Sequence, residues 1–170
     1  MRAREVFERL QQLAASGRGA LRLERRSLHG FEAYERSQTL KEAERWVTIL
    51  SDTAAYGGVW ECYYAGVFTD GEGNVLGAYA SRYVCDRELG YTSSLTYAAP
   101  IAPRLTLVER YGEAVRTREG FREWRESVKE AAVEISAPEA VRELLRELRE
   151  LCPYTRLSDA KGTPIRWPAL

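Results

Sequence analysis

The sequence predicts an α+β protein in which two helices precede a four-stranded antiparallel meander and two helices follow it. Apolar residues recur at helical spacing over residues 3–15 and 40–50. A stretch rich in aromatic and β-branched residues follows between Val59 and Arg110, and helical spacing returns from Thr117. With 170 residues, of which 45% are hydrophobic and 29% charged, the chain has the composition of one globular domain. We expect that domain to span residues 1–153, with residues 154–170 as a C-terminal tail.

Two helices are predicted before the sheet. Apolar residues at helical spacing indicate the first over residues 3–15, and the alternation from Ala20 to Arg25 is typical of a short strand after it. Thr39 and Glu42 match a capping box, which predicts a second helix over residues 40–50. Its apolar stripe would consist of Leu40, Ala43, Val47 and Leu50.

The meander begins with a hairpin. Residues 59–69 and 75–85 are rich in Val, Tyr, Phe and Trp, and turn residues fill the gap from Asp70 to Asn74. Residues 91–97 and 105–110 continue the meander. With 70–74 as the loop, Thr69 lies opposite Val75 and the numbers of opposed residues sum to 144.

This register assigns each side chain of the hairpin to a face, because side chains alternate along a strand. Cys62 and Cys85 are predicted on opposite faces, so they would not form a disulfide. Glu61 would share the second face with several tyrosines, among them Tyr63, Tyr79 and Tyr83. The first face would carry Trp60, Tyr64, Phe68 and Arg82, beside the hydroxyls of Thr92, Ser94 and Thr96.

Two helices are predicted after the sheet. The segment from Ser136 to Glu139 combines a capping box with a proline in the first turn, and so separates them. The last helix has a 3,4,3 leucine-type spacing, which fits either a core helix or a short coiled-coil seam that would make the protein a homo-oligomer. The stripe before the break consists of Phe121, Trp124, Val128, Ala131 and Ile135, and the seam of Val141, Leu144, Leu148 and Leu151.

Several classes of protein are disfavoured. No run of about 20 apolar residues indicates a membrane span, and the N-terminus lacks the apolar core of a signal peptide, so we expect a cytoplasmic protein. The three cysteines and the single histidine, His29, do not have the spacing of a zinc site, and no nucleotide, cofactor or hydrolase motif is present. We therefore expect no metal, no cofactor and no enzymatic activity. Abundant Glu and Arg with one asparagine suit a thermophile.

The predicted face with Trp60, Tyr64, Phe68 and Arg82 is the best candidate for a site. Aromatic planes beside an arginine bind unpaired bases, at roughly 1 to 3 kcal/mol per stacked base, with little dependence on sequence. This predicts binding of single-stranded DNA or RNA with limited sequence specificity. The competing interpretation is that strand aromatics fill the core.

The order of elements, with an aromatic meander around Trp60 to Tyr64 and a leucine-spaced C-terminal helix, resembles the ThermoDBP family of single-strand nucleic-acid-binding proteins from hyperthermophilic archaea. The resemblance implies an aromatic cleft, here Trp60, Tyr64 and Phe68 with Arg82 at its floor, and oligomerisation through the C-terminal helix. Two other functions stay open: a structural or adaptor protein that self-associates through residues 139–151, and an enzyme without a recognisable motif.

Overall fold

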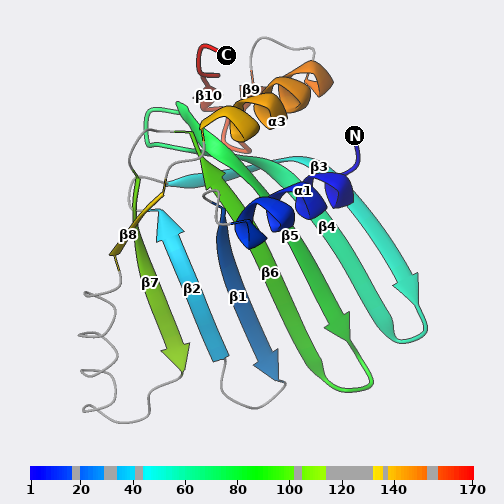
Figure 1. The fold of residues 1–170 in the computed structure, drawn as a ribbon. Helices are drawn as coiled ribbons and strands as arrows, with labels where there is room; N and C mark the ends of the chain where they lie inside the picture. The colour runs from blue at the N-terminus through cyan, green and yellow to red at the C-terminus, as the bar shows by residue number, and fades with distance from the viewer. Residues whose placement is uncertain are drawn as a thin grey trace.

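The protein is described by a computed structural model that covers residues 1–16, 20–28, 34–40, 44–101, 105–113, 132–135, 138–152 and 157–170. Within these residues, two helices lie on one face of a large antiparallel sheet (Figure 1). The α+β class is thereby confirmed. The long strands extend well beyond α1 and α3, so among the described elements one part of the sheet is covered by these helices and another part lies past them (Figure 1).

The main sheet has eight strands in the order β3-β4-β5-β6-β1-β2-β7-β8, and all neighbours are antiparallel. The predicted meander is confirmed for three strands, but β1 and β2 are inserted before the fourth, β7. The strands are β1 (Leu21–Leu28), β2 (Tyr34–Leu40), β3 (Arg45–Tyr56), β4 (Val59–Thr69), β5 (Val75–Asp86), β6 (Tyr91–Pro100), β7 (Leu105–Glu113) and β8 (Ala132–Ile135), and a separate small hairpin consists of β9 (Leu157–Ser158) and β10 (Pro164–Ile165).

Two predicted helices require correction. Residues 45–50, assigned to the second helix, lie in strand β3, and residues 34–40 before them form β2. The capping-box pattern at Thr39 and Glu42 did not lead to a helix. The pairing of residues 45–56 with β4 outweighs their local helix propensity. In the helix predicted after Thr117, residues 132–135 form β8, and residues 117–131 lie outside the described part of the chain.

Helix α1 (Ala3–Ala15) covers the sheet with the apolar stripe that the sequence predicts. Val6 and Leu10 are fully buried, and the Phe7 ring packs edge-on against Tyr63 and Tyr97, with ring centroids 5.5 and 5.2 Å apart. Edge-to-face packing of this kind adds roughly 0.5–1.5 kcal/mol to the burial of the rings. Phe7 therefore fixes the position of the helix over β4 and β6.

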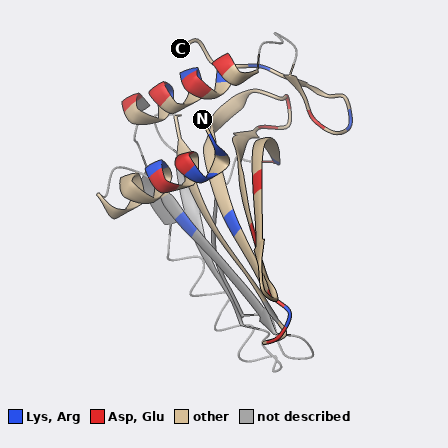
Figure 2. Ribbon diagram, turned by 90° about the vertical axis from the view of Figure 1, so that its right-hand side faces the viewer, with Lys and Arg blue, Asp and Glu red and all other residues tan. Residues whose placement is uncertain are grey.

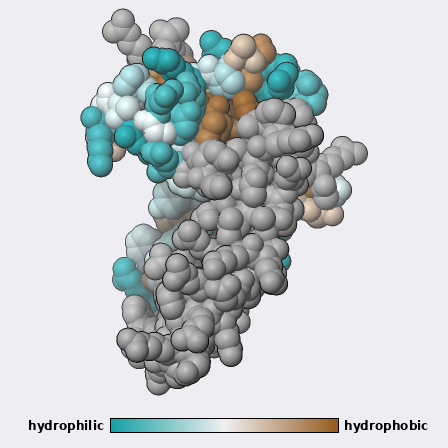
Figure 3. Space-filling view, turned by 90° about the vertical axis from the view of Figure 1, so that its left-hand side faces the viewer, coloured by the Kyte–Doolittle hydropathy of each residue, from teal (hydrophilic) through white to brown (hydrophobic). Residues whose placement is uncertain are grey.

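Helix α3 (Pro138–Leu151) confirms the last predicted helix but not its use as a subunit seam. Val141, Leu144 and Leu148 are buried in the core of the same chain, together with Leu145, and Leu151 is 42% exposed. Seen from the left-hand side of Figure 1, hydrophobic residues lie between hydrophilic groups at the helical end of the molecule (Figure 3). The leucine spacing thus reflects packing of α3 against the sheet and α1.

The pairing of β4 with β5 differs from the predicted register by one residue. Thr69 lies opposite Val75, as predicted, but Phe68 lies opposite Gly77, so Leu76 is an extra residue in β5. Beyond this bulge, Cys62 lies opposite Tyr83 and Cys85 opposite Trp60. The two cysteines therefore share a face, contrary to the prediction, although both are free thiols.

The bulge is stabilised by segments distant in sequence. The amide of Val75 donates to the carbonyl of Arg166 at 2.8 Å, and the carbonyl of Leu76 accepts from the amide of Ile101 at 2.9 Å. Gly73, with φ of 83°, sits so close to the carbonyl of Pro164 that a Cβ atom would overlap it. Because local spacing carries no information about these partners, the sequence pattern missed the shift.

The segment predicted as a C-terminal tail is part of the packed domain. Ile165 belongs to the main hydrophobic core, and Leu157, Trp167 and Leu170 pack against it. Asp159 forms an ion pair with Arg45 at the start of β3. The residues from 157 to 170 therefore extend the domain.

In the described residues, neither helix has the length and hydrophobicity needed to cross a membrane.

We predict that Leu148→Ala destabilises the protein by about 2–5 kcal/mol, because it removes a fully buried side chain and leaves a cavity. Leu151→Ala is the matched control, and its effect should stay within about 0.5 kcal/mol because Leu151 is exposed. Urea denaturation measures both. If Leu148→Ala kept the parental stability and only reduced the mass in light scattering, α3 would be a subunit seam instead.

Candidate functional site

The face of the sheet opposite α1 and α3 carries a group of exposed aromatic side chains, which we call the open face. Trp60 and Tyr64 on β4 are 40% and 37% exposed, and Tyr83 on β5 is 39% exposed. Alternation puts Trp60, Cys62 and Tyr64 on one face, and Tyr83 joins them because it lies opposite Cys62. Along the strands, Tyr83 stands midway between Trp60 and Tyr64, which are about 13 Å apart.

Polar groups surround these rings. The guanidinium carbon of Arg87, in the turn after β5, lies 5.2 Å from the centre of the Trp60 ring, within the range of a cation–π contact. The Ser81 and Thr96 hydroxyls share a hydrogen bond of 2.7 Å on the same face. A hydrogen bond with the Cys62 thiol raises the pKa of the Tyr64 hydroxyl, so Tyr64 stays a neutral phenol at physiological pH.

The carboxylates of the aromatic strands lie away from the open face. Among the described residues of β3 to β6, the acidic ones are Asp52, Glu61 and Asp86, and the register aligns all three on the helix side. Asp52 accepts a hydrogen bond from the backbone amide of Arg4 in α1, and Asp86 accepts from two amides in the turn that follows it. The open face of these strands is therefore free of negative charge.

Phe68, a predicted site residue, is fully buried. It lies on the open face, but its ring rests over Gly77 of the neighbouring strand, where a Cβ atom would overlap the ring. Trp46 packs against it with ring centroids 5.4 Å apart, and Tyr79 contacts Trp46 at 4.9 Å. Phe68 thus belongs to an aromatic cluster at the other end of the open face, and no base can reach it in this structure.

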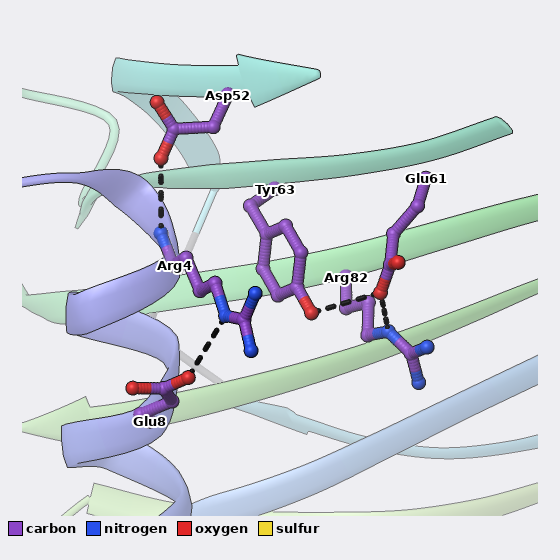
Figure 4. Close-up of polar contacts among 6 residues, drawn as sticks. All are labelled: Arg4, Glu8, Asp52, Glu61, Tyr63 and Arg82. Atoms are coloured by element: carbon purple, nitrogen blue, oxygen red, sulfur yellow. Dashed lines mark hydrogen bonds and ion pairs between the residues drawn. The ribbon is translucent and has the colours of Figure 1, made fainter. Parts of the chain in front are cut away.

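Arg82, the predicted cation of the aromatic face, lies on the helix side. The one-residue bulge moves it opposite Tyr63, and its Nε forms an ion pair with Glu61 (Figure 4). The Tyr63 hydroxyl donates to the same carboxylate at 2.8 Å and the Tyr56 hydroxyl at 2.9 Å. The structure therefore brings Trp60 and Tyr64 together and separates both from Arg82.

The Glu61 carboxylate is held in its ionised form. Burial by itself would raise the pKa of Glu61, but the hydrogen bonds from Arg82, Tyr63 and Tyr56 outweigh burial, so the pKa is lowered. Burial and the bond to Glu61 raise the pKa of Tyr63. Both carboxylate oxygens of Glu61 accept hydrogen bonds, which indicates a structural role.

Close to this cluster, the Arg4 guanidinium lies 5.9 Å from the centre of the Tyr63 ring and donates a hydrogen bond of 2.9 Å to Glu8 (Figure 4).

A groove of about 540 Å³ lies between α1 and α3. Arg9 of α1 bridges it to both carboxylate oxygens of Glu147 of α3, at 2.7 and 2.6 Å. Since Leu13 and Leu144 also line the groove, we interpret it as the seam between the two helices. In the part of the chain that the structure describes, no group of three histidine, cysteine or acidic side chains is close enough to hold a metal ion.

The sequence pattern missed two residues of the open face, Tyr83 and Arg87. Tyr83 was assigned to the other face by the register, so the one signal that would have placed it correctly is the bulge after Phe68. Arg87 lies in a turn, and its contact with Trp60 depends on the closure of the β5–β6 hairpin beside β4. Neither feature has a local sequence signature.

We predict that Glu61→Gln lowers the free energy of unfolding at pH 7 by about 1–2 kcal/mol, because it removes the charge that three donors share, one of them on a half-exposed arginine. A lowered folded-state pKa stabilises the fold above the unfolded pKa and loses this effect as the pH falls through the folded value. The difference from the parent should therefore shrink toward pH 3 in urea denaturation. Glu72→Gln, in an exposed turn, is the control, and an equal loss at pH 7 and pH 3 would contradict the electrostatic explanation.

Comparison with protein families, characterised proteins and solved structures finds no match for the chain. The resemblance based on the order of elements relied in part on a helix at residues 40–50, where the structure has strand β3 from Arg45. The function of the protein is therefore argued below from the geometry of the open face.

Proposed function

We propose that the protein binds single-stranded DNA or RNA with limited sequence specificity by stacking bases on Trp60, Tyr83 and Tyr64. The observation that carries this proposal is the exposure of three aromatic rings on a sheet face that presents no carboxylate from the described strands β3 to β6. Successive rings are about 7 Å apart along the strand direction, which suits an extended strand of bases.

The chemistry of the face supports low sequence specificity. Ring stacking accepts any base, since every base has a π face. The Ser81 and Thr96 hydroxyls form a hydrogen bond with each other, so they are not positioned to form hydrogen bonds with the edges of bases. Among the side chains that the structure describes, Arg87 is the cation next to the rings. Its position over Trp60 lets it reach a phosphate of a base stacked there.

The small number of cations determines how binding should respond to salt. Each phosphate contact contributes about −0.7 to the slope of log affinity against log salt for a single strand. With Arg87 as the main contributor, we expect a slope near −1 and affinity that depends chiefly on stacking. An uncharged aromatic surface also suits a protein partner. Oligonucleotide titration distinguishes the two functions.

We predict that Trp60→Ala and Tyr64→Ala each weaken binding of oligo-dT by about 1–3 kcal/mol, because each removes a stacking platform. Tyr64→Ala should leave the salt slope unchanged, since Arg87 lies over Trp60 and not over Tyr64. Tyr56→Ala is the matched control: Tyr56 is an exposed aromatic, but it belongs to the helix side and should not alter affinity. Fluorescence anisotropy of a labelled oligonucleotide at two salt concentrations, on variants shown by circular dichroism to be folded, measures these effects.

Arg87→Ala should instead bring the salt slope close to zero, whereas Arg82→Ala should leave it unchanged, since Arg82 is paired with Glu61 on the helix side. Absence of oligonucleotide binding by the parent would overturn the proposed function. Loss of binding in Tyr56→Ala and not in Trp60→Ala would move the site to the helix side of the sheet.

A further inference from the structure

We propose that strand β3 pairs antiparallel with β3 of a second copy of the chain, so that two sheets join edge to edge. This interface is separate from the stacking platform and goes beyond the proposed function. The described sheet ends at β3, whose one strand neighbour is β4. Figure 2 faces this edge and shows the long strands mostly tan, with most of the red and blue on the helices.

The free edge lies in residues 50–56. A bulge between Thr48 and Leu50 interrupts the pairing of β3 with β4, and from Leu50 the register is regular up to Tyr56. Residues 53–56 are all exposed. Among the described residues, the backbone groups of 50–56 make hydrogen bonds to β4 alone, so half of their donors and acceptors remain available to another strand.

This edge has few of the features that prevent strands from pairing. Natural edges are protected by lysine, by proline, by bulges or by short length. Residues 50–56 contain neither lysine nor proline, and their one charged side chain, Asp52, accepts a hydrogen bond from the Arg4 amide on the helix side. A seven-residue edge of this kind is expected to accept a partner strand.

The side chains of this edge fit a second copy in one register. With a two-fold axis at Thr53, Leu50 lies opposite Tyr56 of the partner, Asp52 opposite Ala54, and Thr53 opposite Thr53. Large side chains then meet large ones, two threonines meet, and the two Asp52 carboxylates do not face each other. An axis at Asp52 would set like charges opposite one another. The pairing about Thr53 is also closed, as a two-fold interface must be.

The pairing would have a consequence for the open face. Even-numbered residues of this segment share the helix side, because Leu50 lies opposite Ala65 and Tyr56 opposite Val59. The register about Thr53 sets even residues against even ones, so both copies keep their helices on the same side. The two open faces would therefore form one continuous surface. Since seven paired residues make a small interface, we expect a dissociation constant in the micromolar range.

Cysteine crosslinking tests the register. In a chain with Cys62, Cys85 and Cys152 replaced by serine, Thr53→Cys should form an intermolecular disulfide under mild oxidation, because directly opposed residues have Cα atoms about 4.5–5.5 Å apart. Ala55→Cys is the matched control on the same strand and face. Its two copies would be about 14 Å apart along the strands and should not crosslink. A disulfide in Ala55→Cys and not in Thr53→Cys would overturn the register.

Light scattering on the chain with its native cysteines tests the interface without relying on the serine replacements. The parent should approach twice the 19.3 kDa mass of one chain as its concentration rises through the micromolar range. Thr53→Lys should remain at the single-chain mass, and Ser158→Lys, at an exposed position in β9, should behave as the parent. A parent that stays monomeric at millimolar concentration, or a dimer that Thr53→Lys leaves intact, would overturn the proposal.

Discussion

The pairing of β4 with β5, shifted by one residue between Phe68 and Thr69, determines which side chains of these two strands face the helices and which face outward. Because side chains alternate with a period of two, a shift of one residue exchanges the two faces of one strand relative to its neighbour. The ion pair of Arg82 with Glu61 on the helix side and the placement of Tyr83 beside Trp60 both follow from it.

The two faces of the sheet have different chemistry for a physical reason. The helix side contains the main core, and its carboxylates find donors there: Asp52 accepts from the amide of Arg4 at the start of α1, and Glu61 accepts from Arg82 and two tyrosines. Along β3 to β6, the open face carries no carboxylate and presents aromatic, hydroxyl and thiol groups. Trp60 and Tyr64 point away from the helices and are 40% and 37% exposed, which is the basis of the proposed stacking function.

The long strands also expose an edge of the described sheet. β3 is long because β4 is long, and the helices cover only part of both (Figure 1). A strand of 12 residues at the end of a sheet presents unpaired backbone groups that require water or a partner. The free edge therefore arises from the length of the β3–β4 hairpin, whereas the open face arises from the alternation of side chains along the strands.

The sequence by itself determined the α+β class, α1, the strands of the central hairpins and α3, since each has a strong local period. It also named Trp60 and Tyr64 as candidates, and the structure places both on the open face with 40% and 37% exposure. It did not determine that residues 45–50 form a strand, that α3 packs inward, that Phe68 is buried over Gly77, or that Arg82 faces the helices. Tertiary structure decided these points. Strand pairing outweighs helix propensity, and the bulge that fixes the register depends on hydrogen bonds to Ile101 and Arg166, whose proximity no local pattern encodes.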